Sequence, residues 1–378
     1  MKKLLLLSAS ALLSFSAMAQ VTEPTLTKAW DTKGTIPTAR FATAYNGTIY
    51  ALDHAATKII AVTENDATDF VTNALLKGVA ITCDSNGNLI VNKMGAGNST
   101  AISNWAVVPV NNKENITELT LTAPTDNYTA GRIDAMGRFI GDVTKNAVFY
   151  ATPVNNTRAF YVKINSGVST ATCSTEALTT DYQTTTYKAW GSTSALAQAV
   201  GTYDEISALE NPEDCCIIRD RSVNKLFYFE NKEVKTVKLP SNVGTACAFD
   251  AVKLNGVVYY ILPTKNTSGT AYGTGFVVFD GEGNVVAEET KSDEGDNQTS
   301  IIAEKVSDTK ANIYHYVMGK KASMYTFEVP EVSTAIESVA VDANAPVEYY
   351  NLQGVKVANP ENGLFIKKQG NKATKVIL

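Results

Sequence analysis

The sequence predicts an all-β protein. Few windows repeat apolar residues with the 3.6-residue period of an amphipathic helix. Short alternating runs rich in Val, Ile, Tyr, Phe and Thr recur instead, and each is bounded by Asn, Gly, Asp or Lys. That pattern is typical of β-strands joined by turns.

The strand runs come in pairs, each with a turn signal, an apolar and aromatic strand, a polar loop and a second apolar strand. Six such units begin at Asn46, Asn86, Asn146, Asn224, Asn255 and Asn312. Their spacing is irregular but averages near that of propeller blades. A hairpin cannot bury both faces alone, and radial stacking removes the exposed edges that an open sheet would leave. We therefore predict a β-propeller over residues 20–331, with six blades favoured. The longest interval contains residues 184–200, and a seventh blade or an insertion over one face would fit there.

One of these units carries a family resemblance. The segment from Gly78 to Val91 holds the turn Asn86-Gly87 between two apolar runs. It resembles the inner strand and hairpin of bacterial propeller blades of the NHL and lactonase-like type. The resemblance implies a fold and no particular activity.

The N-terminus has the three parts of a cleaved secretory signal over residues 1–19. Lys2 and Lys3 precede an apolar stretch, and Ala17-Met18-Ala19 supplies the small residues of a cleavage site. No Cys follows that site, so we do not expect a lipoprotein. No later apolar run approaches the ~18 residues that a membrane-spanning helix needs. We expect an exported, soluble protein of the periplasm, the cell surface or the medium.

The C-terminus reads as a separate small β-module over residues 347–378, after a linker over residues 332–346. Its marks are the turn Asn351-Leu352-Gln353-Gly354 and the strands Gly363–Ile366 and Lys375–Ile377. The tail is similar to a short type IX sorting domain, as found in exported proteins of Bacteroidetes, and this implies lineage and export. The alternative is a small β-module that caps the propeller.

The charge of the chain argues against nucleic acid as a partner, and its cysteines do not indicate a disulfide framework. The formal net charge is -5, and removal of Lys2 and Lys3 with the signal takes it to -7, without any basic block. Nucleic acid is therefore not an expected partner, and we expect a monomer. The five cysteines are odd in number and irregularly spaced. We expect buried small residues, with one intermolecular or distant pair as the alternative.

Motifs for catalysis or metal binding are absent from the sequence. Only His54 and His315 are available to a Ser-His-Asp triad, and His315 alternates with tyrosines in an expected strand, where a hydrogen-bonded structural role is favoured. No GxSxG, HExxH or Walker pattern occurs. The acidic run Asp293–Asn297 does not match a calcium loop, and we interpret it as a solvated loop. No catalytic residue, metal or cofactor is predicted.

Aromatic and charged side chains on a propeller face remain as candidate ligand contacts. These are Trp105, Trp190 with Tyr187, and the pair Arg132 and Asp134. Each Trp has an alternative as a core or inter-blade residue. Trp190 lies in the irregular long segment, where functional loops concentrate.

Two functional hypotheses follow. The first is an exported, non-catalytic binding protein of the cell envelope with a glycan or a protein as its ligand. The second is a propeller enzyme, a glycosidase, lyase or lactonase-like hydrolase, with carboxylates scattered over different blades. The side chains along the central channel discriminate between them: three or more converging acids around an ion favour the enzyme.

Overall fold

The structure is a computed structural model of the whole chain. It describes residues 23–78, 80–92, 104–122, 133–136, 140–153, 160–164, 171–174, 198–200, 216–220, 225–230, 233–244, 248–269, 272–290, 293–296, 299–331, 345–369 and 372–378. Contacts divide the chain into two compact units with the boundary between Pro330 and Glu331.

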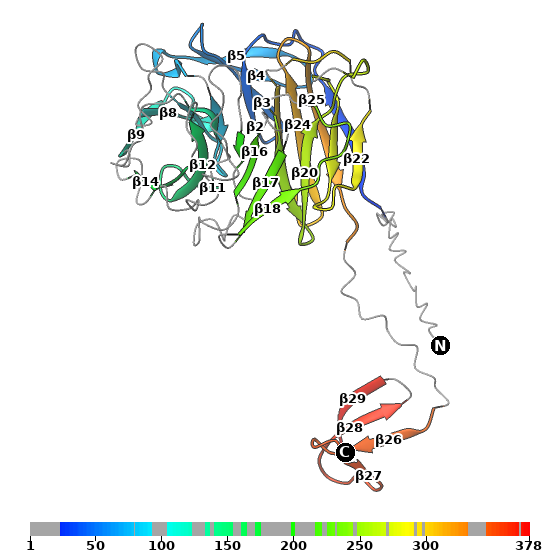
Figure 1. Cartoon of the computed structure of the whole chain (residues 1–378). Coiled ribbons are helices and arrows are strands. Elements are labelled where there is room, and N and C mark those ends of the chain that lie inside the picture. Colours follow the sequence, from blue (N-terminus) through cyan, green and yellow to red (C-terminus); the bar gives the residue numbers. More distant parts are fainter. Residues whose placement is uncertain are drawn as a thin grey trace, which may run out of the picture. The chain divides into compact units, whose positions relative to one another are not determined.

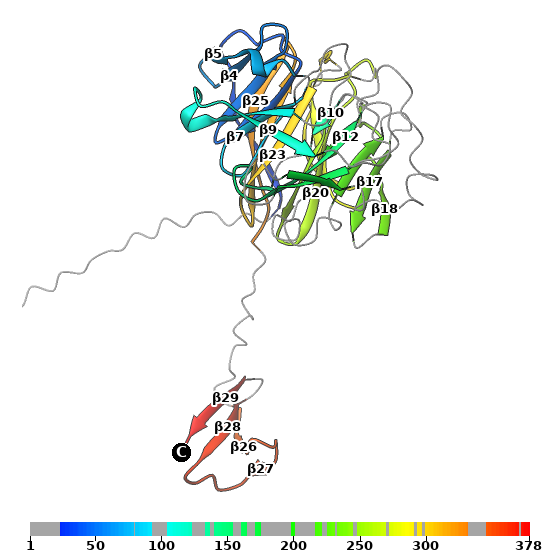
Figure 2. The same cartoon turned by 90° about the vertical axis from the view of Figure 1, so that its left-hand side faces the viewer.

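The strands of the first unit form four four-stranded sheets and one nine-stranded sheet (Figures 1 and 2). The nine-stranded sheet consists of two consecutive antiparallel groups joined by one parallel strand pair, so the unit has six blades. The first blade contains β2 (Phe41–Tyr45), β3 (Thr48–Asp53), β4 (Lys58–Val62) and β5 (Ala67–Thr72). The second contains β6 (Ile81–Cys83), β7 (Asn88–Asn92), β8 (Asn104–Pro109) and β9 (Thr117–Thr122). The third contains β10 (Ile133–Met136), β12 (Ala147–Pro153), β13 (Phe160–Ile164) and β14 (Ala171–Ser174), with β11 (Ile140–Gly141) beside β12.

The remaining three blades follow the same order. The fourth contains β15 (Gln198–Val200), β16 (Cys216–Asp220), β17 (Lys225–Glu230) and β18 (Glu233–Val237). The fifth contains β19 (Asp250–Leu254), β20 (Val257–Pro263), β21 (Phe276–Phe279) and β22 (Val285–Glu289). The sixth contains β23 (Thr299–Ser307), β24 (Lys310–Val317), β25 (Lys321–Glu328) and, from the other end of the chain, β1 (Thr25–Asp31). Two short 3-10 turns, η1 (Ala74–Leu76) and η3 (Val110–Asn112), complete the described elements of this unit.

The turn residues explain why these hairpins form. Asn46 and Gly47 have φ of 46° and 83°, and Asn255 and Gly256 have φ of 48° and 79°. Both central positions of such tight turns need positive φ, which Asn tolerates and Gly adopts freely. Other hairpins use a carboxylate instead: Asp280 accepts hydrogen bonds from the backbone N–H of Glu282 and Asn284.

Strand β1 closes the ring. It pairs antiparallel with β25 from Thr25 opposite Glu328 to Asp31 opposite Ser323. The last blade therefore takes its outermost strand from the N-terminal side of the chain, which brings the blue and orange parts of Figure 1 together. Because closure joins the first and last blades, no inter-blade face is left exposed at the seam.

Among the described residues, apolar layers fill four of the spaces between consecutive blades. The layer between the sixth and first blades contains Tyr314 and Tyr316 packed against Ala44 and Ile49. Comparable layers join the first to the second blade, the fourth to the fifth, and the fifth to the sixth. In the second and third blades, the outermost strands β9 and β14 also pair in parallel. The predicted propeller, with six blades formed by the described residues, is confirmed by this arrangement.

The second unit is a four-stranded sheet in the order β27 (Lys356–Val357), β26 (Val347–Tyr350), β28 (Leu364–Gln369) and β29 (Lys372–Ile377). It confirms the predicted small C-terminal β-module. None of the described residues with an assigned exposure in this sheet is fully buried. Leu352, Val355 and Ile377 are 56%, 60% and 83% exposed. The sheet therefore lacks a core of its own in its described part.

Within the described residues, no helix has the length and apolarity required to cross a membrane.

Candidate functional site

The candidates from the sequence fall in different places. Tyr187, Trp190 and Arg132 lie outside the described residues. Asp134 belongs to β10, the innermost strand of the third blade, where the structure describes the backbone only. Trp105 on β8 is 0% exposed, and it packs as a core residue. Of these five residues, only Trp105 has a described side chain, and it is buried.

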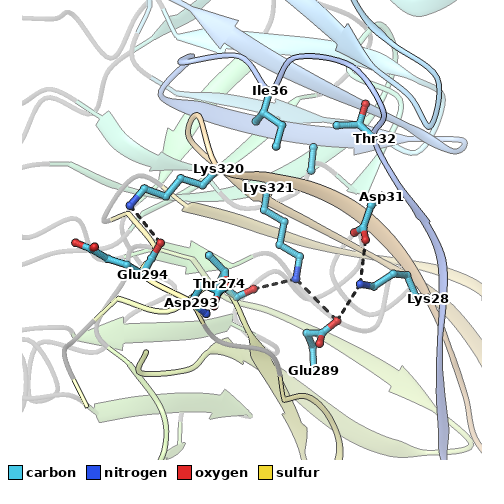
Figure 3. A pocket seen from close by; sticks show the side chains of 11 residues that line it. Lys28, Asp31, Thr32, Ile36, Thr274, Glu289, Asp293, Glu294, Lys320 and Lys321 are labelled. Atoms are coloured by element: carbon cyan, nitrogen blue, oxygen red, sulfur yellow. Dashed lines mark hydrogen bonds and ion pairs between the residues drawn. The ribbon is translucent and has the colours of Figure 1, made fainter. Parts of the chain in front are cut away.

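A cavity of about 470 Å³ lies between the fifth and sixth blades, and we call it the groove (Figure 3). Its volume falls within the ~300 to ~1,000 Å³ typical of ligand pockets. Its lining comes from the ends of β1, β22 and β25 and from the loops beside them: Lys28, Asp31, Thr32, Ile36, Thr274, Glu289, Asp293, Glu294, Lys320, Lys321 and Ala322.

The groove opens on the propeller face where the innermost strands begin. Thr299, the first residue of β23, pairs with Val317, the last residue of β24. Val317 in turn pairs with Lys321, which begins β25 and lines the groove. Loops between blades and loops within blades alternate at this face, so side chains from distant parts of the chain meet here.

Glu289 is the central charge of the groove floor. Its carboxylate lies 3.4 Å from the Lys28 ammonium and 3.9 Å from the Lys321 ammonium, and it accepts a 2.6 Å hydrogen bond from the Tyr325 hydroxyl. Lys321 also donates to the carbonyl of Thr274 at 3.0 Å. The Glu289 and Lys321 side chains are only 13% and 14% exposed. An ion pair buried to this extent is stable only when hydrogen bonds satisfy its remaining polar atoms. Here the Tyr325 hydroxyl and the Thr274 carbonyl provide those hydrogen bonds.

Asp31 is the last residue of β1, and its contacts hold the side of the groove that β1 forms. It forms a 3.0 Å ion pair with Lys28 and accepts a 2.5 Å hydrogen bond from the Ser323 hydroxyl. Burial alone would raise the pKa of Asp31, but the hydrogen bonds from Ser323 and Lys28 outweigh it and lower that pKa. Burial alone would also lower the pKa of Lys28, and Asp31 and Glu289 reverse that effect. Both groups therefore stay charged near neutral pH.

The opposite rim is held by backbone pairing. Gly273 forms an antiparallel bridge with Glu294, and the N–H of Asp293 donates to the Thr274 hydroxyl at 2.9 Å. A Cβ on Gly295 would lie 2.5 Å from the Gly273 carbonyl oxygen, so only glycine fits there. Lys320 donates to the carbonyls of Glu294 and Gly295 at 3.2 and 2.8 Å. These contacts hold the backbone of Asp293 and Glu294 in place, while their side chains are exposed.

His315 lies in β24 behind the groove floor and is 0% exposed. The expectation of a hydrogen-bonded structural histidine is wrong in one respect, because neither ring nitrogen has a hydrogen-bond partner. Its ring packs edge-on against Phe276 at 5.4 Å instead. Burial lowers the pKa of His315 well below its ordinary value, and the nearby Lys321 charge adds to that shift. Ser323 pairs opposite His315 but donates its hydroxyl to Asp31, so no Ser-His-Asp triad forms here.

The innermost strands carry a second set of polar contacts. Asp250 on β19 accepts a 2.7 Å hydrogen bond from the N–H of Ala303 on β23. Ser300 on β23 accepts one of 3.0 Å from the N–H of Ala42 on β2. Thr43 and Thr82 are buried on β2 and β6. Glu304, also on β23, accepts a hydrogen bond from the Tyr314 hydroxyl. Among the residues that the structure describes, no group of three or more His, Cys, Asp or Glu is placed to hold a metal.

A second, smaller cavity of about 250 Å³ lies at the opposite ends of β23, β2 and β6. Asp84 and Glu304 line it, and the carboxylates of both accept hydrogen bonds from neighbouring parts of the propeller. Asp84 accepts hydrogen bonds from the N–H groups of Asn86, Asn88 and Val143, and Glu304 accepts from the hydroxyl of Tyr314. Burial raises the pKa of Asp84, although these hydrogen bonds oppose the shift.

The groove supports binding through charge and hydrogen bonds. Lys28 and Asp31 are held charged by their partners, whereas a general acid or base needs a pKa near the working pH. The sequence singled out only the Asp293–Asn297 run among the groove residues. The other lining residues carry no local signal, because they belong to ordinary strand ends and turns.

No protein-family model and no curated protein matches the chain. Solved β-propeller structures resemble it at low sequence identity. They include BBS1N in complex with ARL6DN (8% identity, TM-score 0.44, 82% of this chain and 98% of that one) and a luciferin-regenerating enzyme (8%, 0.41, 81% and 95%). A glycosyl hydrolase from Bacteroides ovatus is similar at 12% identity and a TM-score of 0.33 over 79% of this chain and 85% of that one. At this similarity no activity is transferred, and the propeller fold of this chain is established by its own sheet order and ring closure.

Proposed function

We propose that this chain is an exported, non-catalytic binding protein of the cell envelope, and that the groove between the fifth and sixth blades holds a segment of a protein partner. The observation that carries the proposal is the groove itself. It has the volume of a ligand site, and the charged groups of its floor are held in place by ion pairs and hydrogen bonds, which suits contact with a polar ligand.

A protein ligand suits the groove better than a glycan does. Sugar rings are commonly held on aromatic faces, and none of the groove-lining residues is aromatic. Seven of the lining residues carry charges, and charged groups at an interface give specificity through complementary charges on a polypeptide partner. A glycan remains the alternative ligand at the segment around Trp190.

Export and surface location are part of the same proposal. The signal pattern over residues 1–19 supports export, and the resemblance of the C-terminal module to a short sorting domain of Bacteroidetes supports retention at the envelope. The exposed apolar residues of that module, such as Ile377, support a role in contacting another molecule.

The proposal is tested by titrating the mature protein with a panel of envelope glycans and a panel of charged and neutral peptides. We expect peptide binding that weakens in Lys321→Ala, because that variant removes the contacts of Lys321 with Glu289 and with the Thr274 carbonyl that hold the groove floor. The matched control Lys253→Ala, which lies outside the groove, should have no effect. Selective glycan binding that is lost in Trp190→Ala but unchanged in Lys321→Ala would contradict it. Turnover of a glycoside or lactone would favour the enzyme alternative.

A further inference from the structure

We infer that one face of the C-terminal sheet docks on a membrane surface that contains anionic lipid; this rests on the envelope location proposed above. The strand register defines the face (Figures 1 and 2). Residues opposite each other in an antiparallel pair share a face, and so do residues two apart on one strand. Six side chains of β26, β28 and β29 therefore lie on one side, and we call them the basic face: Tyr350, Leu364, Ile366, Lys368, Lys375 and Ile377.

The basic face is the open side of the sheet. Leu364 and Ile377, which lie opposite each other, are 42% and 83% exposed, and Lys368 and Lys375 are exposed as well. On the other side of β28, side chains such as Phe365 are partly buried. Large aliphatic side chains grouped at an open surface favour a partner that removes them from water.

The charge of the module indicates the charge of that partner. Residues 345–378 contain five lysines and two glutamates, whose side chains give a formal net charge of +3, although the whole chain carries -5. Glu348 is engaged by the Lys356 ammonium at 2.5 Å and by the Tyr350 hydroxyl at 2.8 Å. In the described part of the module, Lys368 and Lys375 form no hydrogen bond or ion pair. The face therefore complements a negatively charged partner.

A membrane surface uses both the apolar and the charged parts of the face. Along β28, Leu364 and Ile366 are followed by Lys368 on the same side. At a bilayer interface, aliphatic side chains enter the acyl boundary while lysines reach the anionic head groups. Tyr350, opposite Ile366, is an aromatic of the kind that favours the head-group region.

Other occupants use less of the basic face. A free phosphate would engage the lysines and leave Leu364 and Ile377 in water. A second copy of the module carries the same positive charge, so contact between two basic faces would bring like charges together. An acidic protein would complement the charge, and the experiment below includes it as a separate outcome.

The test is co-sedimentation of the mature full chain with vesicles of phosphatidylcholine alone or of equal parts phosphatidylcholine and phosphatidylglycerol. At low salt we expect at least about tenfold tighter binding to the anionic vesicles, with the difference shrinking as salt rises. Lys368→Gln/Lys375→Gln should weaken this binding about tenfold or more, because two cations near the head groups are removed. Lys368→Arg/Lys375→Arg should retain it. The matched control Lys145→Gln/Lys305→Gln, on the propeller, should change nothing.

A second pair of variants tests the apolar part. Leu364→Ser/Ile377→Ser should weaken binding to the anionic vesicles about tenfold, because two aliphatic side chains no longer enter the interface. The matched control Val257→Ser/Val306→Ser changes two exposed valines of the propeller and should bind like the wild type. The lysine variants keep the length of their side chains, so they decide the question if the serine variant unfolds the module.

The following results would overturn the inference: equal binding to neutral and anionic vesicles, or vesicle binding that is unchanged in Lys368→Gln/Lys375→Gln. Binding of poly-glutamate without binding of vesicles would assign the face to an acidic protein. A dimer that dissociates in Leu364→Ser/Ile377→Ser would assign it to a second copy. Peptide binding at the groove should be the same in all these variants, so failure of vesicle binding is distinguishable from failure of the proposed binding function.

Discussion

The Asp250 carboxylate on β19 accepts a 2.7 Å hydrogen bond from the backbone N–H of Ala303 on β23, so a side chain of the fifth blade completes the inner edge of the sixth. Asp250 is 8% exposed, and its other oxygen accepts from the N–H of Ala251 at 2.8 Å. An inner strand has an unpaired edge toward the axis, and this carboxylate satisfies part of it.

We predict that Asp250→Ala destabilises the propeller by about 2–4 kcal/mol, because two buried backbone N–H groups lose their acceptors. Asp250→Asn keeps one acceptor oxygen and should cost about half as much. Urea unfolding monitored by tryptophan fluorescence measures both. Equal stability of wild type and Asp250→Ala would show that this hydrogen bond does not hold the blades together.

His315 should make the propeller sensitive to mild acid. Its folded pKa lies well below its ordinary value of ~6.5, whereas in the unfolded chain it titrates near that value. Below pH ~6.5, His315 becomes protonated in the unfolded state but stays neutral in the folded state. The free energy of unfolding therefore falls as the pH falls, by up to about 1.4 kcal/mol per pH unit. The shift contributes no such loss above pH ~7.

The measurement is the free energy of unfolding between pH 5 and 7. We expect His315→Phe to flatten the slope, because Phe fits beside Phe276 and carries no titrating group. His54→Gln is the matched control, in which the contribution of His315 to the slope should persist. An unchanged slope in a folded His315→Phe variant would assign the acid sensitivity to other groups.

Gly47 and Gly87 form a matched pair for testing backbone strain against side-chain contact. Their φ values are 83° and 81°, but a Cβ on Gly47 meets nothing within 4 Å, whereas one on Gly87 would lie 2.5 Å from the Tyr45 ring. Gly47→Ala should cost about 1 kcal/mol for the left-handed conformation alone. Gly87→Ala should cost about 2–4 kcal/mol, since overpacking adds to that strain.

Thermal unfolding of the two variants tests this difference. In a Tyr45→Ala background, Gly87→Ala should lower the stability by less than it does in the wild type, because the clash with the Tyr45 ring is removed and only the backbone strain remains. Identical losses in Gly47→Ala and Gly87→Ala would show that the turn moves freely away from Tyr45.

Truncation after residue 335 should leave a folded propeller with a melting temperature within a few degrees of the full chain. All six blades lie before Pro330, and blade stacking needs only neighbouring blades and the closing strand β1. A chain that stops after Lys320 lacks β25 and should not fold. Differential scanning calorimetry distinguishes the cases, and an insoluble chain ending at 335 would contradict the division into two units.

The sequence predicted the fold because its signals are local. Asn46-Gly47 and Asn255-Gly256 form the tight turns that their side chains favour, and the alternating runs beside them are strands. The sixth blade was predicted as a hairpin, but its fourth strand could not be. β1 comes from the opposite end of the chain, and its pairing with β25 depends on ring closure.

The groove could not be predicted for the same reason. Lys28 and Glu289 are separated by most of the chain, and only the pairing of β1 with β25 brings the two charges to 3.4 Å. Lys321 reaches Glu289 at 3.9 Å because the sixth blade packs against the fifth, which no local sequence pattern indicates. Trp105 was a candidate because of its residue type, yet its place in β8 buries it completely. Residue type alone does not distinguish a core aromatic from a ligand contact.

The central claim, that the groove between the fifth and sixth blades is the binding site, is tested most directly by hydrogen–deuterium exchange of the mature protein with and without a saturating concentration of the peptide that binds most tightly in the titration. We expect added protection in residues 272–274, 293–296 and 320–322, whose backbones border the groove, and unchanged exchange on the first and second blades. Protection confined to the segment around Trp190, or at the 250 Å³ cavity near Asp84, would contradict the claim.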